Sequence, residues 1–470
     1  MKTWVKRLLL SIAFLLIILI AVGGFQISRI GPAATGYTAK MIGSSVFVTG
    51  LSPEAAFADF PDNPVKGLLK IDVDYTHNTV TASLAGLAKR RAIYREGYGV
   101  TLLPQKGSFA HLPSETVTDT ARSGDLDQLW PLGERVELAN LPQTIDQREL
   151  ETALDRAFAE PNPDLPRRTR AVIVVHAGQI VAERYGDGFD EKRLLLGWSM
   201  SKSITNALIG ILVQQGRLDI HQPAPVPEWS LPSDARHAIT VDQLLRMSSG
   251  LEFVEDYGDL TSDVVQMLYV QGDMAAFAAE KPQIYPPDSV WSYSSGTANI
   301  VSRIVRQRIG SLEDYIAFPY RYLFGPLGMQ HTLFEPDAAG TFVGSSFVYA
   351  SARDWARFGL LYLQDGVWQG QRILPEGWVE YSVRPTPNAP LGQYGAFLKL
   401  NAGESERPEK RRWPDLPADL YFADGHEGQH VVIIPSYDLV LVRLGMSQKR
   451  GAWSLHDFIA DVLEAFPEPQ

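Results

Sequence analysis

Residues 199–216 read SMSKSITNALIGILVQQG. Apolar side chains between Ile204 and Leu212 recur at the spacing of one helix face, and Gly216 stands where helices commonly end. Ser199 and Lys202 are three residues apart, so the predicted helix places them one turn apart on the same face. The helix N-terminus favours negative charge at Ser199, and apolar neighbours disfavour the ammonium form of Lys202. The stretch therefore predicts a nucleophilic serine beside a lysine that can carry its proton.

Two further motifs follow this predicted helix along the chain. Residues 291–296 read WSYSSG, and a loop of this kind can present the phenol of Tyr293 to a cleft. A phenolate near Lys202 could take the proton of Ser199. Residues 424–429 read DGHEGQ directly before a predicted strand, where glycines let a substrate approach the backbone. Each motif alone also fits an ordinary turn or helix, so the specific signal is the ordered set.

Taken in order, the motifs Ser-x-x-Lys, Tyr-Ser-Ser and His-x-Gly resemble those of the serine β-lactamase and penicillin-binding superfamily. The likeness is greatest to its class C-type branch, which includes esterases, D-stereospecific peptidases and 6-aminohexanoate-oligomer hydrolases. Three more segments agree with that branch: residues 244–251, 325–329 and 349–354. The resemblance covers about residues 150–470.

The resemblance implies a role for each motif residue. Ser199 is expected to be the acylated nucleophile, Lys202 its proton partner and Tyr293 the general base. The backbone N–H groups of Ser199 and Gln429 are expected to form the oxyanion hole. The substrate-binding positions implied in the same way are Ser295, His426 and Gly428. Neither a metal nor an organic cofactor is implied.

Two departures from the family pattern bear on the substrate. His426 stands where β-lactamases have lysine, and histidine is mostly neutral at pH 7, so a permanent cation for a β-lactam carboxylate is missing. Ser295 stands where many members have asparagine. We therefore expect a serine hydrolase of small ester or amide substrates, with cyclic or D-configured bonds among them. The alternatives are a β-lactamase or D,D-peptidase, and a non-catalytic binding protein.

A second motif overlaps the last one, because residues 426–430 also spell the zinc-peptidase pattern His-Glu-x-x-His. That pattern binds zinc only on a helix, where the two histidines converge. Gly425 and Gly428 interrupt this stretch, and β-branched residues follow it. On a strand the two histidines stand about 13 Å apart, too far to share one ion. A zinc peptidase is the least favoured interpretation.

The composition of the chain excludes further classes of function. The chain of 470 residues has no cysteine, which excludes disulfides, thiolate metal sites and a cysteine nucleophile. Its net charge is −11 and its basic residues are scattered, so we expect no nucleic-acid partner.

The N-terminus predicts a membrane segment. Lys6 and Arg7 precede an uncharged apolar run from Leu8 to about Phe25, and eighteen residues just span a hydrocarbon core of about 30 Å. Basic residues before the run favour an N-terminus in the cytoplasm. We expect a single-pass anchor in the cytoplasmic membrane with the catalytic part on the periplasmic side. A cleaved signal peptide and secretion are the alternative.

Three regions follow from these patterns. Residues 1–30 are the anchor or signal segment, residues 31–145 a β-rich extension, and residues 146–470 the serine hydrolase domain. Runs such as 45–48, 71–75 and 79–82 favour strands in the extension. The family resemblance implies an α/β (α+β) fold for the hydrolase domain. Its expected parts are a five-stranded antiparallel sheet flanked by helices and a mainly helical subdomain.

Overall fold

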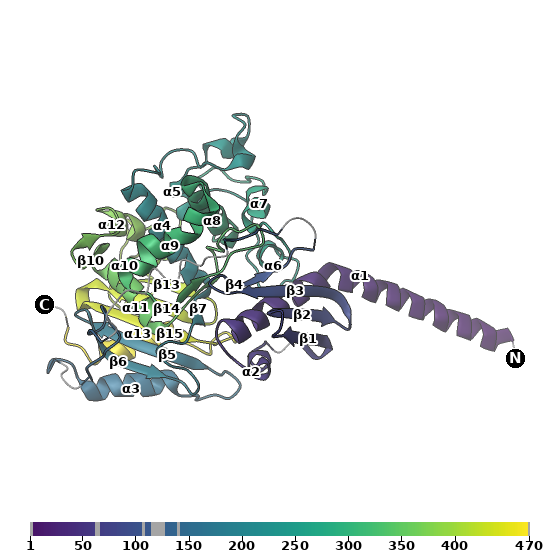
Figure 1. Cartoon of the computed structure of the whole chain (residues 1–470), viewed down its shortest axis with the longest axis horizontal. Helices are drawn as coiled ribbons and strands as arrows, with labels where there is room; N and C mark the ends of the chain where they lie inside the picture. Colours follow the sequence, from purple (N-terminus) through teal and green to yellow (C-terminus); the bar gives the residue numbers. More distant parts are fainter. Residues whose placement is uncertain (1–2, 62–65, 106–108, 114–126, 139–141, 469–470) are drawn as a thin grey trace.

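The computed structural model describes residues 3–61, 66–105, 109–113, 127–138 and 142–468 (Figure 1). The strands are β1 (Leu69–Asp74), β2 (Thr79–Leu84), β3 (Leu87–Arg95), β4 (Gly99–Leu102), β5 (Thr169–His176), β6 (Gln179–Tyr185), β7 (Leu195–Leu196), β8 (Thr332–Phe334), β9 (Val348–Ala350), β10 (Val367–Trp368), β11 (Gln371–Arg372), β12 (Lys399–Leu400), β13 (Tyr421–Gly425), β14 (Gln429–Ile434) and β15 (Leu439–Gly445). The α-helices are α1 (Thr3–Phe47), α2 (Pro53–Ala58), α3 (Gln147–Phe158), α4 (Ser201–Gln214), α5 (Val241–Leu245), α6 (Asp263–Tyr269), α7 (Met274–Ala279), α8 (Ser295–Ile309), α9 (Leu312–Pro319), α10 (Gly325–Leu327), α11 (Ala352–Leu363), α12 (Trp378–Val383) and α13 (Leu455–Leu463).

A six-stranded antiparallel sheet, in the order β12-β13-β14-β15-β5-β6, forms the central layer. Successive side chains of a strand point to opposite faces, and here helices cover both faces. Val172 and Val174 of β5 belong to the core cluster shared with α3 and α13. Ile173 and Val175 belong to the larger cluster that contains α4 and α11. The predicted antiparallel sheet flanked by helices is confirmed, with the two-residue β12 as an additional sixth strand.

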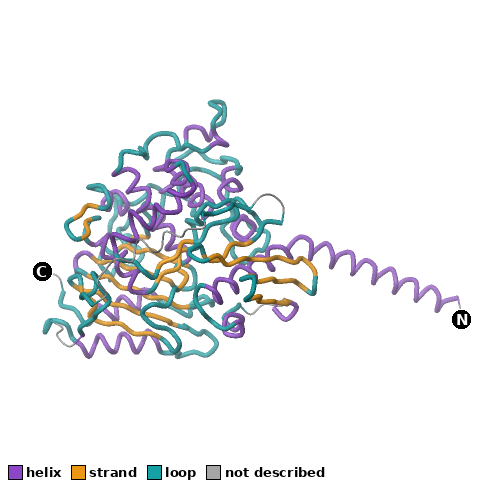
Figure 2. The backbone as a smooth tube through the Cα atoms, in the orientation of Figure 1, coloured by secondary structure: helices purple, strands orange, loops and turns teal. Residues whose placement is uncertain are grey.

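The helices from α4 to α10 form a second part, seen above the strands in Figure 2. Helix α8 contacts α4, α5 and α7, and its buried face joins the same core cluster as the inner face of the sheet. The two parts therefore share one hydrophobic core. The starts of α4 and α8 meet at Lys202 and Ser295, whose side chains are hydrogen-bonded.

Helix α1 and the four-stranded sheet β1-β2-β3-β4 make up the N-terminal part. The second half of α1 packs against β2, β3, β4 and α6, while its first half extends beyond the rest of the molecule (Figure 1). The strands predicted at 71–75 and 79–82 are found, but the strand predicted at 45–48 is wrong. The segment is the end of helix α1, and Gly43 lets this helix pack closely on the sheet, because a Cβ there would lie only 3.0 Å from the Val100 side chain.

The prediction of a transmembrane anchor over residues 1–30 is also wrong. Among the helices of the described residues, none combines the length and the apolar character needed to cross a membrane. The helix continues through Pro32 to Phe47, and its buried residues lie from Ala33 onward. The predicted membrane partner and the single-pass periplasmic location both depended on this anchor, so they are not supported either.

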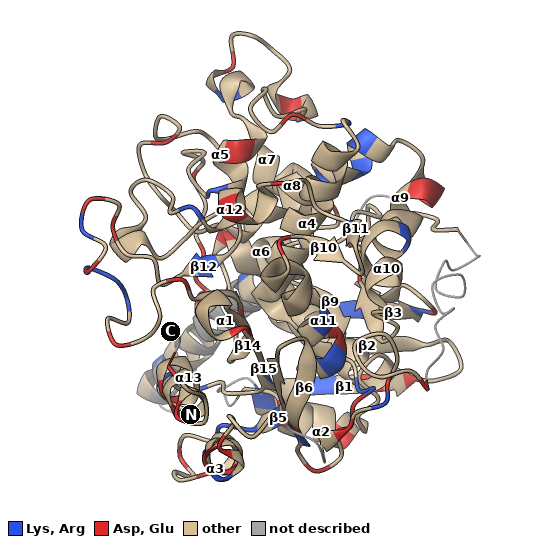
Figure 3. Ribbon diagram, turned by 90° about the vertical axis from the view of Figure 1, so that its left-hand side faces the viewer, with Lys and Arg blue, Asp and Glu red and all other residues tan. Residues whose placement is uncertain are grey.

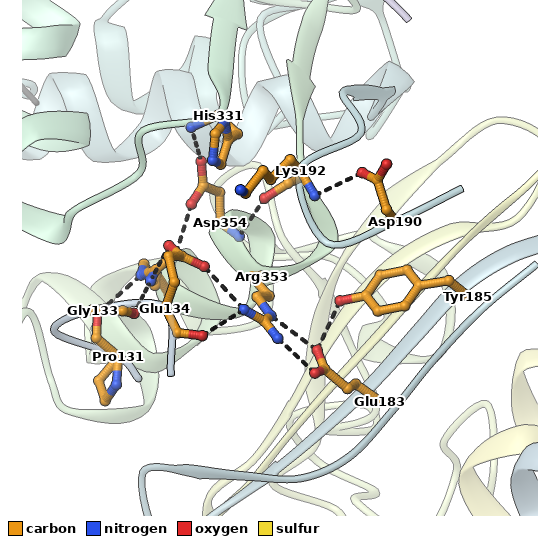
Figure 4. A network of polar contacts seen from close by, with 12 residues as sticks. Pro131, Gly133, Glu134, Glu183, Tyr185, Asp190, Lys192, His331, Arg353 and Asp354 are labelled. Carbon is orange, nitrogen blue, oxygen red and sulfur yellow. Dashed lines mark hydrogen bonds and ion pairs between the residues drawn. The ribbon is translucent and has the colours of Figure 1, made fainter. Parts of the chain in front are cut away.

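Ion pairs of Arg353 connect helix α11 with strand β6 of the central sheet and with the segment around Glu134 (Figure 4). Arg353 of α11 donates two hydrogen bonds to the carboxylate of Glu183 on β6 and one to the carbonyl of Glu134. Asp354 accepts the backbone N–H of His331. Residues 349–354, which we matched to the family from sequence, therefore hold α11 and its neighbours in place. Figure 3 shows charged residues of both signs interspersed over the elements.

Candidate active site

The backbone around Ser199 is held in a strained turn. Trp198 begins a short 3₁₀ helix that leads into α4, and its φ of 48° lies in the left-handed region. The Ser201 hydroxyl donates to the carbonyl of Trp198 and accepts the N–H of Val348 on β9. Gly197 is packed so tightly that a Cβ there would lie 2.4 Å from the ring of Trp355. This packing fixes the position of Ser199 at the start of α4.

Lys202 is buried one turn after Ser199, and its side-chain nitrogen lies within hydrogen-bond distance of three oxygen atoms. Lys202 Nζ lies 2.9 Å from Ser199 Oγ, 3.0 Å from Ser295 Oγ and 3.0 Å from the carbonyl oxygen of Ser345. The motif residues Ser199 and Lys202 are thus in direct contact, as the Ser-x-x-Lys spacing predicts. Ser295, at the start of α8, is fully buried against Lys202 rather than displayed at a surface.

Burial makes the neutral amine of Lys202 accessible near neutral pH. It lowers the pKa of Lys202 to about 8, with Glu255 opposing the shift and Lys399 adding to it. Asp424 opposes it as well, and Lys399 and Asp424 form an ion pair of 2.6 Å. An amine with this pKa can exchange protons with Ser199 under physiological conditions.

Tyr293 lies on the other side of the lysine, in the loop before α8. Its ring centroid is 4.8 Å from Lys202 Nζ, and its ring meets that of Tyr394 edge-on at 5.9 Å. Burial raises the pKa of Tyr293 well above its ordinary value, and the neighbouring Tyr394 and Glu255 raise it further. A hydrogen bond with Ser199 opposes this shift. The raised pKa keeps Tyr293 a protonated phenol in this state, and the general-base role that the family resemblance implies for it stays a prediction.

His426 and Gly428 lie in the turn between β13 and β14. His426 is exposed; its ring stacks on Tyr257 at 5.2 Å and meets Trp198, next to Ser199, edge-on at 5.7 Å. Gly428 has a φ of 83°, and a Cβ there would lie 2.6 Å from Arg443. The turn geometry accounts for the glycine without a substrate. The residues His426 and His430 stand on a turn and a strand, so the helix required by the zinc-peptidase motif is not formed here.

Gln429 is the first residue of β14, opposite Gly425 of β13. The pairing of β14 with β15 begins at the next residue, His430, and the expected role of the Gln429 N–H in the oxyanion hole stays a prediction. Its side-chain amide bonds both backbone groups of Gly445. It is the end of β13 that abuts the nucleophile turn, since a Cβ at Gly425 would lie 2.2 Å from the carbonyl oxygen of Gly197.

Sequence reasoning missed Glu255, whose carboxylate reaches this site. Glu255 Oε1 accepts the Ser295 hydroxyl at 2.5 Å, and Oε2 accepts the Ser295 N–H at 2.7 Å. The sequence does not single it out, because Glu252 and Asp256 stand close to it in the same loop. Residues 252–257 alternate between exposed and half-buried positions, which turns Phe253, Glu255 and Tyr257 inward and leaves the neighbouring acids outside.

The fold and the Ser199–Lys202–Tyr293 arrangement define the class of β-lactamase-related serine hydrolases. The chain belongs to the Beta-lactamase family, whose family model matches residues 154–463, well over half of its length.

Named relatives of the chain include hydrolases. It is 30% identical over 248 residues to the 6-aminohexanoate-dimer hydrolase of Paenarthrobacter ureafaciens, a match that covers 48% of this chain and only 60% of that relative. A Bacillus anthracis structure assigned to the same kind of hydrolase superposes with a TM-score of 0.56 at 21% identity, covering 78% of this chain and all of the other. A family VIII carboxylesterase gives a TM-score of 0.50 at 16% identity, covering 69% of this chain and 98% of the other. At these identities the structures share the fold.

Proposed function

We propose that this protein hydrolyses amide or ester bonds of small substrates through an acyl-enzyme formed on Ser199. The observation that carries the proposal is the contact of Lys202 Nζ with Ser199 Oγ at 2.9 Å. The amine is buried, its pKa is lowered to about 8, and it lies next to a hydroxyl at the start of a helix. This is the arrangement that an activated serine nucleophile requires.

In the proposed acylation, the neutral Lys202 amine takes the proton of Ser199 while Ser199 Oγ bonds to the substrate carbonyl carbon. The carbonyl oxygen gains the negative charge, which the backbone N–H of Ser199 at the helix start stabilises. We assign the second N–H to His426, in the turn directly after β13, in place of Gln429. Strand β12 pairs only with Tyr421 and Phe422, so the last residues of β13 are free of β12.

The intermediate then collapses, and the bond between the carbonyl carbon and the leaving nitrogen or oxygen breaks. The protonated phenol of Tyr293 gives its proton to the leaving group, and the Lys202 ammonium restores the phenol. Water attacks the resulting ester by the reverse proton path, which releases the acid and regenerates Ser199.

The substrate class that we propose is short linear amides, such as the dimer named for the Paenarthrobacter relative, and short esters. Trp291, Tyr293 and Tyr394 form an aromatic cluster beside the nucleophile, with ring centroids 5.4 Å and 5.9 Å apart, which suits an aliphatic chain. At the position where β-lactamases have lysine, His426 supplies no permanent cation, which disfavours penicillins.

Turnover of a substrate panel tests this proposal. The full chain is assayed on the 6-aminohexanoate dimer, p-nitrophenyl butyrate and a chromogenic cephalosporin, beside Ser199→Ala and the exposed control Ser292→Ala. We expect amide or ester turnover in the wild type and in Ser292→Ala, and none in Ser199→Ala. Equal turnover in Ser199→Ala would contradict the assignment, and hydrolysis of the cephalosporin alone would contradict the substrate class.

A further inference from the structure

Glu255 provides a carboxylate beside the serine–lysine pair, from a loop between α5 and α6. Its two oxygens receive both hydrogen-bond donors of Ser295, and the hydroxyl of Tyr257 approaches Oε1 at 3.4 Å. An ionised carboxylate is acceptor-only, so this set of donors fits the charged form of Glu255. Burial raises the pKa of Glu255 above its ordinary value, whereas the neighbouring Lys202 and the hydrogen bonds from Ser295 and Tyr257 counteract that shift and favour the charged form.

The contact with Glu255 decides where the single hydroxyl proton of Ser295 points. A serine hydroxyl has one proton to donate and two lone pairs that accept. Because Ser295 Oγ lies 2.5 Å from Glu255 Oε1, its proton is directed to the carboxylate. Toward Lys202, at 3.0 Å on another side, Ser295 can then only accept.

The direction of the Ser295 proton also determines where the N–H bonds of Lys202 point. In the neutral amine, two N–H bonds are available and one lone pair remains. The carbonyl of Ser345 can only accept, and Ser295 Oγ accepts because of Glu255, so these two groups take both N–H bonds. Ser199 Oγ is the third neighbour, at 2.9 Å, and faces the lone pair.

We propose that Glu255 is a positioning residue of the reaction: by holding the Ser295 proton, it orients the lone pair of the neutral Lys202 amine toward Ser199. Without Glu255, the Ser295 hydroxyl is free to donate to Lys202 and to compete with Ser199 for that lone pair. Glu255 thus acts through Ser295 and Lys202 and does not touch the reacting atoms.

The negative charge of Glu255 has a second effect, which is to raise the pKa of Lys202. The groups that face Lys202 are Glu255, Lys399 on β12, Asp424 on β13 and the ring of Tyr293. Glu255 is the largest contributor among them that raises the pKa of Lys202. Removing its charge lowers the pKa of Lys202, so the reactive neutral amine forms at lower pH.

The test is the pH dependence of Ser199 phosphonylation, measured with a fluorophosphonate probe on the full chain by intact mass. Glu255→Gln preserves the size of the side chain and removes its charge. We expect its maximal labelling rate to fall about 10- to 100-fold, the effect of losing one hydrogen bond to a charged group. We also expect the midpoint of its pH–rate curve to move to lower pH than in the wild type.

Two further variants make this result interpretable. Glu252→Gln changes an exposed glutamate of the same loop in the same way and should match the wild type in both rate and midpoint. Ser295→Ala removes the hydroxyl through which Glu255 acts. Adding Glu255→Gln to Ser295→Ala should therefore lower the maximal rate little further, because the two groups work as one unit.

The outcomes separate this inference from the proposed function on which it rests. Absence of Ser199-dependent labelling in the wild type would overturn the proposed function itself. Normal wild-type labelling together with an unshifted midpoint in Glu255→Gln would overturn the role of Glu255 alone. A slower rate at an unchanged midpoint would also overturn it, since that is the effect of a purely structural residue. The role of Glu255 would likewise be overturned if the losses in labelling rate of Glu255→Gln and Ser295→Ala added up in the double variant.

Discussion

The side chains of Lys40 and Glu335 form a buried ion pair, although 295 positions separate them in the sequence. Lys40 is on α1, and Glu335 directly follows β8. The Lys40 ammonium also lies 4.1 Å from the ring centroid of Phe347, two residues beyond the Ser345 carbonyl that binds Lys202. The N-terminal helix therefore supports the segment whose Ser345 carbonyl accepts a hydrogen bond from Lys202.

Lys40→Met should destabilise the protein by about 3–5 kcal/mol, because it leaves the Glu335 carboxylate buried without its cation. Urea unfolding at pH 7 measures this change. Lys192→Met, at an exposed position, serves as the matched control and should leave the unfolding free energy within about 0.5 kcal/mol of the wild type. A loss equal to that of the control would show that the buried pair contributes nothing.

The same variant should show a pH dependence of definite sign. Burial raises the pKa of Glu335 above its ordinary value, and Lys40 counteracts the shift. In Lys40→Met the folded state therefore binds more protons than the unfolded state, and stability falls as the pH rises from the ordinary glutamate value. We expect the difference from the wild type to be smaller at pH 5 than at pH 8. A difference that grows toward low pH would contradict the assignment.

Tyr293→Phe separates proton donation to the leaving group from activation of Ser199. A protonated phenol is needed when the leaving group is an amine, and much less when it is p-nitrophenolate. We expect amide turnover to fall by about 10²–10⁴-fold, the range of general acid catalysis, and ester turnover far less. Equal losses on both substrates would instead support Tyr293 as the base for acylation.

Gly197→Ala should disturb the nucleophile turn through sterics alone. The φ of Gly197 is −83°, which alanine adopts freely, but the added Cβ would meet the Trp355 ring at 2.4 Å. We expect a loss of about 1–3 kcal/mol in stability, together with lower activity, measured by thermal unfolding and ester turnover. Gly67→Ala, where a Cβ meets nothing within 4 Å, is the control. Wild-type behaviour of Gly197→Ala would show that the turn tolerates displacement.

Local patterns predicted the parts of this site that lie close together in the sequence. The helical spacing from Ser199 to Lys202 determines their contact, and apolar neighbours around Lys202 already indicated its burial. The sheet and its flanking helices were expected from the family resemblance that these motifs carry.

Long-range packing decided what the sequence could not show. Helix α1 continues past Pro32 because it packs against the surface formed by β2 to β4. The short apolar run at residues 45–48 fits a strand as well as a helix, so the sequence alone did not show this packing. Gln429 pairs with Gly425 in a hairpin register that the motif does not show, and its place in the oxyanion hole was implied by the family resemblance alone. Glu255 lies between two exposed acids, and only contact with Ser295 distinguishes it.

The central claim is that Ser199 is a nucleophile activated by neutral Lys202, and covalent labelling tests it most directly. The full chain is treated with a fluorophosphonate between pH 6 and pH 9, and the adduct is located by peptide mass. We predict a single adduct at Ser199 in the wild type, at a rate that rises with pH through about 8. Neither Ser199→Ala nor Lys202→Met should be labelled. An adduct on another residue, or a rate that is unchanged in Lys202→Met, would contradict it.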